Sequence, residues 1–170
     1  MRDVTICTTD PETGAVTTCQ WPYDAALGAI TIRDLLKDIE PPCEGEEPTT
    51  IPVPNLSGET LLRVTEFVTH HHAHPNPEYD KMCEAERRAA EMVEWDKDFV
   101  TPLKMSEVFD LIMAANYLDL KPLLELSAKR VAQSLKGKSE REIFALFGVD
   151  RDMTEEEREK VKQDHPWLYD

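Results

Sequence analysis

The stretch 108–120, VFDLIMAANYLDL, is apolar on nearly every side of a helix. Such a helix is buried on more than one face, so it belongs at the centre of a packed domain. Lys121-Pro122 comes next and favours the first turn of another helix, because proline fits there without losing a hydrogen bond. This second helix should end near Gly137, and its apolar stripe consists of Leu124, Ala128, Val131 and Leu135. We therefore expect the last part of the chain to be helical.

The N-terminal part has the period of strands instead. Residues 4–9 (VTICTT) and 15–19 (AVTTC) alternate between apolar and polar side chains, with the turn-forming segment 10–14 (DPETG) between them. This pattern predicts a β-hairpin. The prolines of 51–54 (IPVP) remove hydrogen-bond donors, so that segment can form only a short or edge strand. A small sheet followed by helices predicts the α+β (mixed α/β) class.

Serine and threonine residues mark the expected starts of several helices. Thr31 is expected to cap a short helix that reaches about residue 39, and Ser57 to cap the next one. Ser139 and Thr154 are each followed three residues later by a glutamate, which predicts capping boxes. The corresponding helices are expected over 140–147 and from 155 to about 164.

The charge balance limits the kinds of partner. Lys and Arg total 19 against 34 Asp and Glu, so the net charge is −15 at pH 7. Nucleic-acid binding depends on cationic side chains that neutralise phosphates, so we expect no nucleic-acid partner. The same charge disfavours an anionic membrane surface, and the sequence has no apolar stretch long enough to span a bilayer. A protein is the expected partner.

Two acidic segments interrupt the pattern. Residues 40–48 contain prolines and carboxylates but little that could be buried, and 73–94 is similar. The middle of the second segment, 84–92, has high helix propensity but little apolar face. We expect both segments to be mobile loops, the second with transient helical structure.

Catalytic and metal-binding patterns are weak. Phosphate-binding glycine loops, dinucleotide fingerprints and nucleophile elbows are absent from the sequence. The four cysteines form no C-x-x-C pair and are expected to be free thiols. His70 and His74 have the spacing of two zinc ligands on one helix face, but without an evident third ligand surface histidines are the favoured interpretation. We expect no catalytic residue, metal or cofactor; a histidine–metal enzyme is the alternative from another class.

Apolar side chains near the C-terminus exceed what one helix face can bury. The segment 143–147 (IFALF) carries them consecutively, and Trp167, Leu168 and Tyr169 follow the last expected helix. Large aromatic side chains in a strongly charged chain are typical of interface anchors. The alternative is that they fold back onto the core of the protein itself.

Several stretches occur in one order and spacing that is far more specific than a short motif. They are 95–99 (WDKDF), 109–124 (FDLIMAANYLDLKPLL), 131–132, 136–138, 142–143, Phe147, 154–157 (TEEE) and Trp167, with weaker matches at 51–55 and 69–71. In these residues the chain resembles the S-phase kinase-associated protein 1 family, the adaptor subunits of SCF ubiquitin ligases. The resemblance covers the chain nearly from end to end.

The resemblance implies a BTB/POZ-type domain over residues 1–136, with a small N-terminal sheet and a helical remainder. An extension of two extra helices, residues 137–170, would complete the surface that binds F-box proteins. The implied protein is a non-catalytic adaptor of the cytoplasm and nucleus. It bridges a cullin scaffold, which brings the RING subunit and the E2, to F-box proteins that select substrates for ubiquitination and proteasomal degradation.

The resemblance also assigns residues to each partner. Asn116 and Tyr117 match family positions on the cullin-facing side. The positions that match the F-box surface are Phe109, Ile112, Ala128, Val131, Leu135, Ile143, Phe147, Val149 and Trp167. Exposed apolar surface of this kind is compatible with a weak homodimer when no partner is bound. An elongin-C-like adaptor, or a divergent member that binds F-box proteins outside ubiquitin ligases, is the alternative function.

Overall fold

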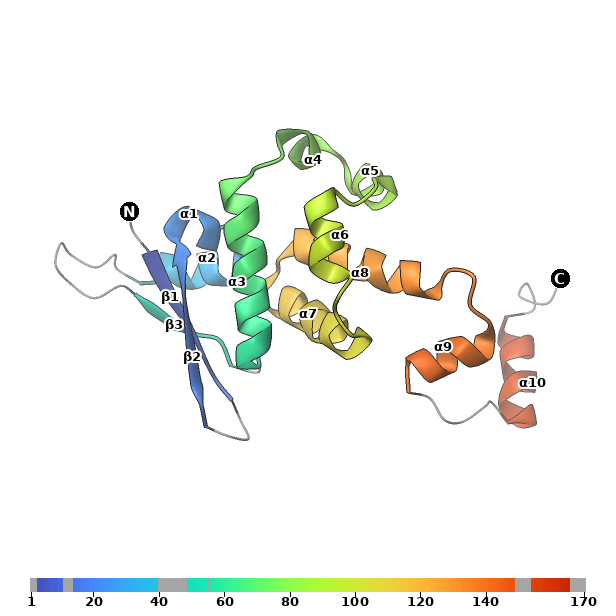
Figure 1. Cartoon of the computed structure of the whole chain (residues 1–170). Coiled ribbons are helices and arrows are strands. Elements are labelled where there is room, and N and C mark those ends of the chain that lie inside the picture. Colours follow the sequence, from blue (N-terminus) through green and yellow to red (C-terminus); the bar gives the residue numbers. More distant parts are fainter. Residues whose placement is uncertain (1–2, 11–13, 40–48, 55, 149–153, 166–170) are drawn as a thin grey trace. The chain divides into compact units, whose positions relative to one another are not determined.

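The computed structural model describes residues 3–10, 14–39, 49–54, 56–148 and 154–165 (Figure 1). These residues belong to two compact units, Met1–Gln133 and Ser134–Asp170. The predicted domain boundary between residues 136 and 137 stays a prediction, and the predicted acidic loop 40–48 lies outside the described residues.

A three-stranded sheet forms one layer of the first unit. Its strands are β1 (Asp3–Thr9), β2 (Val16–Pro22) and β3 (Thr50–Pro52), in the order β2-β1-β3. The strands β1 and β2 pair antiparallel, whereas β3 pairs in parallel with β1 at the edge. The predicted hairpin and the short edge strand are both confirmed.

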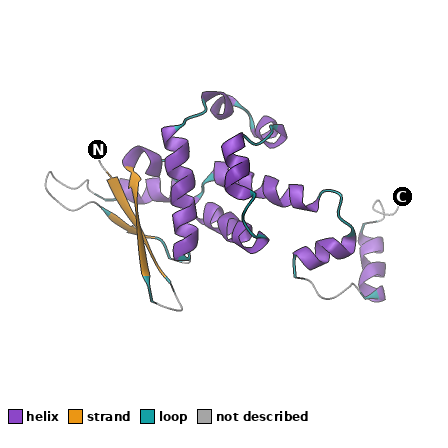
Figure 2. Ribbon diagram, viewed as in Figure 1, coloured by secondary structure: helices purple, strands orange, loops and turns teal. Residues whose placement is uncertain are grey.

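Helices make up most of the remaining described chain (Figure 2). The first unit contains α1 (Tyr23–Ala26), α2 (Ile30–Lys37), α3 (Gly58–Ala73), α4 (Pro77–Lys81), α5 (Glu84–Ala89), α6 (Glu94–Val100), α7 (Met105–Leu118) and most of α8 (Lys121–Leu135). The second unit contains α9 (Glu140–Leu146) and α10 (Glu155–Asp164). None of the helices in the described part of the chain combines the length and apolar character needed to cross a membrane.

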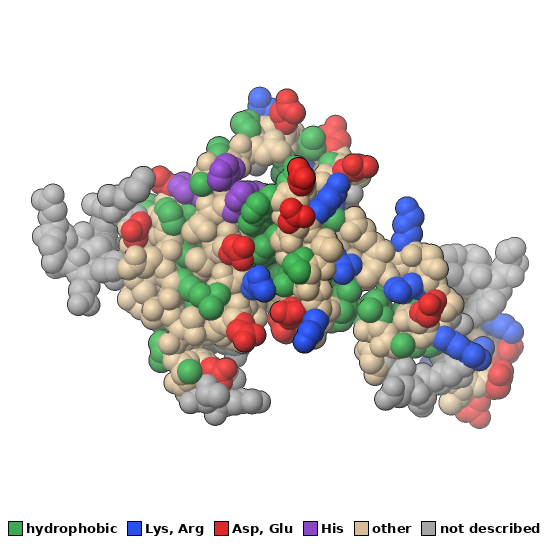
Figure 3. Space-filling view, viewed as in Figure 1, with side chains coloured by type: hydrophobic (Ala, Val, Ile, Leu, Met, Phe, Trp, Pro, Cys, Tyr) green, Lys and Arg blue, Asp and Glu red, His purple; other side chains and the backbone are tan. Residues whose placement is uncertain are grey.

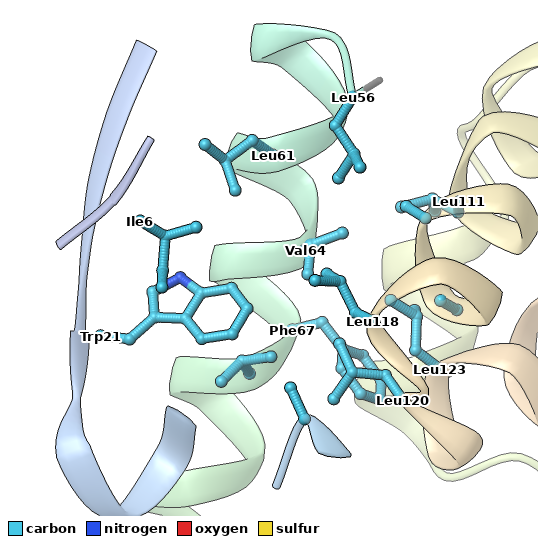
Figure 4. Close-up of a cluster of buried hydrophobic side chains, with 14 of the residues drawn as sticks. Ile6, Trp21, Leu56, Leu61, Val64, Phe67, Leu111, Leu118, Leu120 and Leu123 are labelled. Atoms are coloured by element: carbon cyan, nitrogen blue, oxygen red, sulfur yellow. The ribbon is translucent and has the colours of Figure 1, made fainter. Parts of the chain in front are cut away.

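The core of the first unit is built on both sides of α3 (Figure 4). Trp21 of β2 is fully buried on the sheet side, where its Nε1–H donates a 2.8 Å hydrogen bond to Thr65 Oγ1. On the other side Leu111 and Leu118 of α7 point toward α3. The buried residues of α7 share one side of the helix, because a rotation of about 100° per residue places them within about 120° of each other: Val108, Leu111, Ala114, Ala115 and Leu118. Met113, on the other side, is 69% exposed, so the prediction that the 108–120 helix is buried on more than one face is wrong.

Local capping signals are mostly realised. The Ser57 hydroxyl accepts the Thr60 N–H at the start of α3, and Thr154 and Glu157 exchange both hydrogen bonds of a capping box. Ser139 donates its N–H to Glu142, which holds the pKa of that carboxyl below its usual value. The predicted cap at Thr31 is wrong: α2 begins at Ile30, and Ala29 stands at the cap position.

The segment 73–94 differs from the loop expected there. Residues 77–81 and 84–89 form α4 and α5, and the predicted helix propensity is realised in α5. Asn76 caps α4 by accepting the Tyr79 N–H, and Met92 is buried in the core after α5 ends. The Asn76 cap and the burial of Met92 stabilise a defined structure in this segment. A sequence pattern of regularly spaced apolar residues does not reveal either contribution.

Candidate functional site

The last turn of α7 carries the two residues assigned to cullin binding. The helix ends because Asp119 adopts a left-handed conformation with φ 51°, which aspartate tolerates better than most residues. Leu120 N–H then reaches back to the Ala115 carbonyl at 2.8 Å. This turn leaves Asn116 and Tyr117 on the surface, Tyr117 with 40% of its area exposed.

A hydrogen bond from α2 fixes this turn. The carbonyl groups at the end of a helix have no partner within the helix. The Tyr117 carbonyl accepts a 2.8 Å hydrogen bond from the Thr31 hydroxyl, which explains why Thr31 does not cap its own helix. The turn is therefore held through its backbone, and the Tyr117 side chain is not needed for the contact.

Two further exposed side chains extend this surface. Met113 lies one turn before Asn116 and is 69% exposed, and Leu35 lies one turn beyond Thr31 on α2 with 43% exposed. We call Leu35, Met113, Asn116 and Tyr117 the α2–α7 face. Sequence reasoning missed Met113 and Leu35, although the helical spacing of Met113 from Asn116 was a usable signal.

The predicted F-box residues of the first unit lie on α7 and α8. Phe109 and Ile112 are half-buried on one side of α7, and on α8 Val131 is half-buried and Ala128 exposed. The buried side of α8 is a different one and carries Leu123, Leu126 and Ser127. The stripe of Leu124, Ala128 and Val131 is thus left at least partly open to solvent.

The two predicted partner surfaces adjoin along α7. A rotation of about 100° per residue places Phe109 and Asn116 on the same side of the helix, about two turns apart. Met113 lies between them and is the most exposed large apolar residue of the described chain. One helix therefore contributes to both surfaces.

The second unit holds the other described F-box candidates. Leu135 and Ile143 are half-buried there, and Phe147 is 44% exposed after the end of α9. Glycines with positive φ follow both helices, Gly137 after α8 and Gly148 after α9, as their positions in the sequence predicted. Val149 and Trp167 lie outside the described residues, so their assignment stays a prediction.

Four of the five histidines lie at or directly after the end of α3, at positions 70, 71, 72 and 74 (Figure 3). The His70 ring stacks on Trp95 with 3.7 Å between ring centroids, and its burial lowers its pKa below 6.5. His71 Nε2 lies 2.9 Å from an Asp96 carboxylate oxygen, and a cavity of about 610 Å³ opens beside these residues. Within the described ranges, no group of three or more His, Cys, Asp or Glu side chains is arranged to hold a metal ion. The His70 ring packs against Trp95, and the His71 ring hydrogen-bonds to Asp96.

Comparison with known proteins connects these surfaces to a family. The model of the Skp1 family dimerisation domain matches residues 121–168. The chain is 36% identical over 147 residues to the Dictyostelium discoideum SCF ubiquitin ligase complex protein SKP1a, covering 86% of each chain. It is 37% identical over 142 residues to the E3 ubiquitin ligase complex SCF subunit sconC of Talaromyces stipitatus, covering 84% of each.

The mixed α+β fold, with its small N-terminal sheet and many helices, is BTB-like, as in the Skp1 family. The chain belongs to the Skp1 family.

Proposed function

We propose that this protein is the adaptor subunit of an SCF ubiquitin ligase and bridges a cullin scaffold to F-box proteins. The observation that carries the proposal is the pair of adjoining surfaces on α7: the exposed Asn116-Tyr117 turn and the half-buried Phe109 and Ile112. Relatives named as SCF subunits align over most of their own length, which supports the same role for the whole chain.

Such an adaptor contributes to ubiquitination by positioning its partners relative to each other. Its surfaces carry apolar, amide and phenol side chains, which suit protein contact better than proton transfer. By holding the substrate receptor and the cullin on one domain, the adaptor raises the local concentration of substrate near the ligase's catalytic subunits. The chain itself performs no covalent step in this proposal.

The C-terminal unit favours this function over an elongin-C-like adaptor. Helix α9 and the residue after it add Ile143 and Phe147 to the apolar residues available for a partner. The family model extends through these helices to residue 168. An elongin-C-like protein is expected to end before them.

Co-purification with separate partners tests the proposal. The chain should bind an F-box domain and, in a separate experiment, a cullin N-terminal domain. Phe147→Ala should weaken F-box binding by about tenfold or more, since a partly exposed aromatic residue at an interface is a typical hot spot. Leu62→Ala, at an exposed leucine of α3, is the matched control and should bind normally. A folded wild-type chain that binds neither domain would contradict the proposal.

A further inference from the structure

A cavity of about 610 Å³ lies beside the insert, the segment of α4 and α5 that joins α3 to α6 (Figure 1). Its walls come from α1, the end of α3, α4, the segment after α5, the start of α6 and α8. A volume of about 300–1,000 Å³ is typical of sites for small molecules. None of the described residues that line the cavity is among those assigned to the cullin or to the F-box protein, so the proposed function leaves it without a role.

The floor of the cavity is apolar. It consists of buried side chains that also belong to the hydrophobic core of the domain: Phe67, Val68, Met92, Leu120 and Leu126. Because core side chains are closely packed, they give this floor a fixed shape. Such a floor favours a ligand with an apolar body, whose burial removes apolar surface from water.

Polar contacts between the insert and α8 hold the walls of the cavity in place. The Tyr79 hydroxyl of α4 donates a 2.9 Å hydrogen bond to Glu125 of α8, and the Arg87 guanidinium of α5 lies 3.3 Å from the same carboxylate. Lys129 of α8 donates a 2.9 Å hydrogen bond to the Ala90 carbonyl, directly after α5. The insert is thus attached to α8 through both of its helices, and the cavity is formed before any ligand binds.

Carboxylates predominate among the charged groups that line the cavity. Asp24, Glu91 and Asp96 are present with one ammonium group, that of Lys129, which already donates to a backbone carbonyl. Imidazoles carry little charge at pH 8, so the histidines of the rim do not offset this excess there. The charge of the cavity therefore complements a cation.

Asp96 is the most favourably placed of these carboxylates. It lies in the first turn of α6 with 17% of its side chain exposed, and its Oδ1 is 2.9 Å from His71 Nε2. This hydrogen bond orients the carboxylate, whose second oxygen can accept a hydrogen bond from a ligand. A partly buried carboxylate attracts a cation more strongly than an exposed one, because less water screens the pair.

We propose that this cavity binds a small organic cation, with its apolar body on the floor and its ammonium group toward Asp96. An inorganic cation would gain nothing from the floor, and an uncharged apolar molecule would gain nothing from the carboxylates. The site is independent of the proposed adaptor function, because its described lining residues include none of those assigned to either protein partner. A bound ligand would contact both the insert and α8, and so would stabilise the folded chain.

Two probes of similar shape and opposite charge test the site: naphthylethylammonium and naphthylpropionate. Calorimetric titration of the full chain at pH 8 and ~0.15 M salt should give a dissociation constant about tenfold lower for the ammonium probe. The changes that this probe causes in backbone amide NMR signals should concentrate in residues 67–76 and 91–96. Equal affinity for the two probes, no saturable binding of the ammonium probe, or signal changes concentrated elsewhere would overturn the inference.

Asp96→Asn tests the charge that the proposal assigns to the ligand. The variant keeps the shape of the side chain but removes its charge, so it should weaken binding of the ammonium probe about tenfold. Asp98→Asn makes the same charge change at an exposed residue of α6 outside the cavity, and should bind the probe as the wild type does. Thermal unfolding of both variants checks that the fold is retained.

Val93→Trp tests the cavity without changing its charge. Val93 lines the cavity and is 45% exposed, so a larger side chain there should narrow the site and weaken binding of both probes. Val16→Trp, at an exposed valine of β2 outside the cavity, is the matched control and should bind normally. Wild-type affinity for the ammonium probe in both Asp96→Asn and Val93→Trp would overturn the inference and leave the proposed adaptor function as it stands.

Discussion

The Thr31 hydroxyl donates a 2.8 Å hydrogen bond to the backbone carbonyl of Tyr117, 86 residues further along the chain. It satisfies an acceptor that the end of α7 leaves without a helical partner. The bond fixes α2 relative to the turn that carries Asn116 and Tyr117. Thr31 thereby positions the turn that carries the predicted cullin-binding side chains.

Thr31→Val tests this positioning role. The variant keeps the shape of the side chain but removes the donor, so the free energy of unfolding should fall by about 1 kcal/mol. Cullin binding should weaken more than F-box binding, because the disturbed turn carries Asn116. Thr18→Val, at an exposed threonine of β2, is the control and should leave both affinities unchanged. Unfolding in urea and calorimetric titration supply the measurements.

Asn116→Ala combined with Tyr117→Ala should abolish cullin binding without unfolding the protein. Both side chains are exposed, and the carbonyl that receives Thr31 is retained in the double variant. The free energy of unfolding should stay within about 1 kcal/mol of wild type, as is usual for surface substitutions. A much larger loss of stability would show that these side chains belong to the core instead.

Ser127→Ala should stabilise the protein. Ser127 is fully buried in α8, and within the described part of the chain its hydroxyl has no hydrogen-bond partner. Removing a buried polar group that lacks a partner should raise the free energy of unfolding by about 1 kcal/mol. Thermal unfolding of the two proteins provides the comparison; a lower midpoint for the variant would mean that the hydroxyl is paired.

The pH dependence of stability should report the packing of His70. Burial against Trp95 lowers the pKa of His70 in the folded state below its usual 6.5, so the unfolded state binds more protons near that pH. The free energy of unfolding should therefore fall as the pH drops through about 6.5. His70→Gln should make the decline between pH ~7.5 and ~5.5 shallower.

The neighbouring His72 provides the control for that experiment. It is exposed at the end of α3, and His72→Gln should leave the slope of stability against pH close to that of wild type. Equal slopes in all three proteins would contradict a partly buried His70 with a lowered pKa.

Capping residues in the sequence predicted most helix starts correctly. Ser57 and the Thr154 capping box depend on residues three positions away, so sequence patterns describe them completely. Thr31 has the same local appearance, but its hydroxyl is used by Tyr117 in a distant helix. Local pattern reasoning fails there because a tertiary contact competes for the same group.

The apolar pattern of α8 shows a second limit. The helix has two apolar sides: Leu123 and Leu126 are buried, whereas Leu124 and Ala128 remain partly open to solvent. Periodicity detects both sides but does not tell which one faces the core. The assignments of Asn116 and Tyr117 came from family resemblance, because an exposed amide and phenol have no distinctive pattern of their own.

The insert shows a third limit. Tyr79 and Arg87 both bind Glu125, which lies more than 35 residues away in the sequence. Hydrogen bonds and ion pairs of this kind leave no periodic pattern of apolar residues in the sequence. For that reason the segment that contains α4 and α5 was expected to be a mobile loop with transient helical structure. Their positions depend on α8, which no window of local sequence contains.

Native mass spectrometry of a mixture of this chain, an F-box domain and a cullin N-terminal domain tests the bridging role most directly. The proposed function predicts one complex that contains all three proteins in equal numbers, and its loss when Asn116 and Tyr117 are both replaced by alanine. Two separate binary complexes that never combine would show that the partners compete for one surface, and would contradict the account.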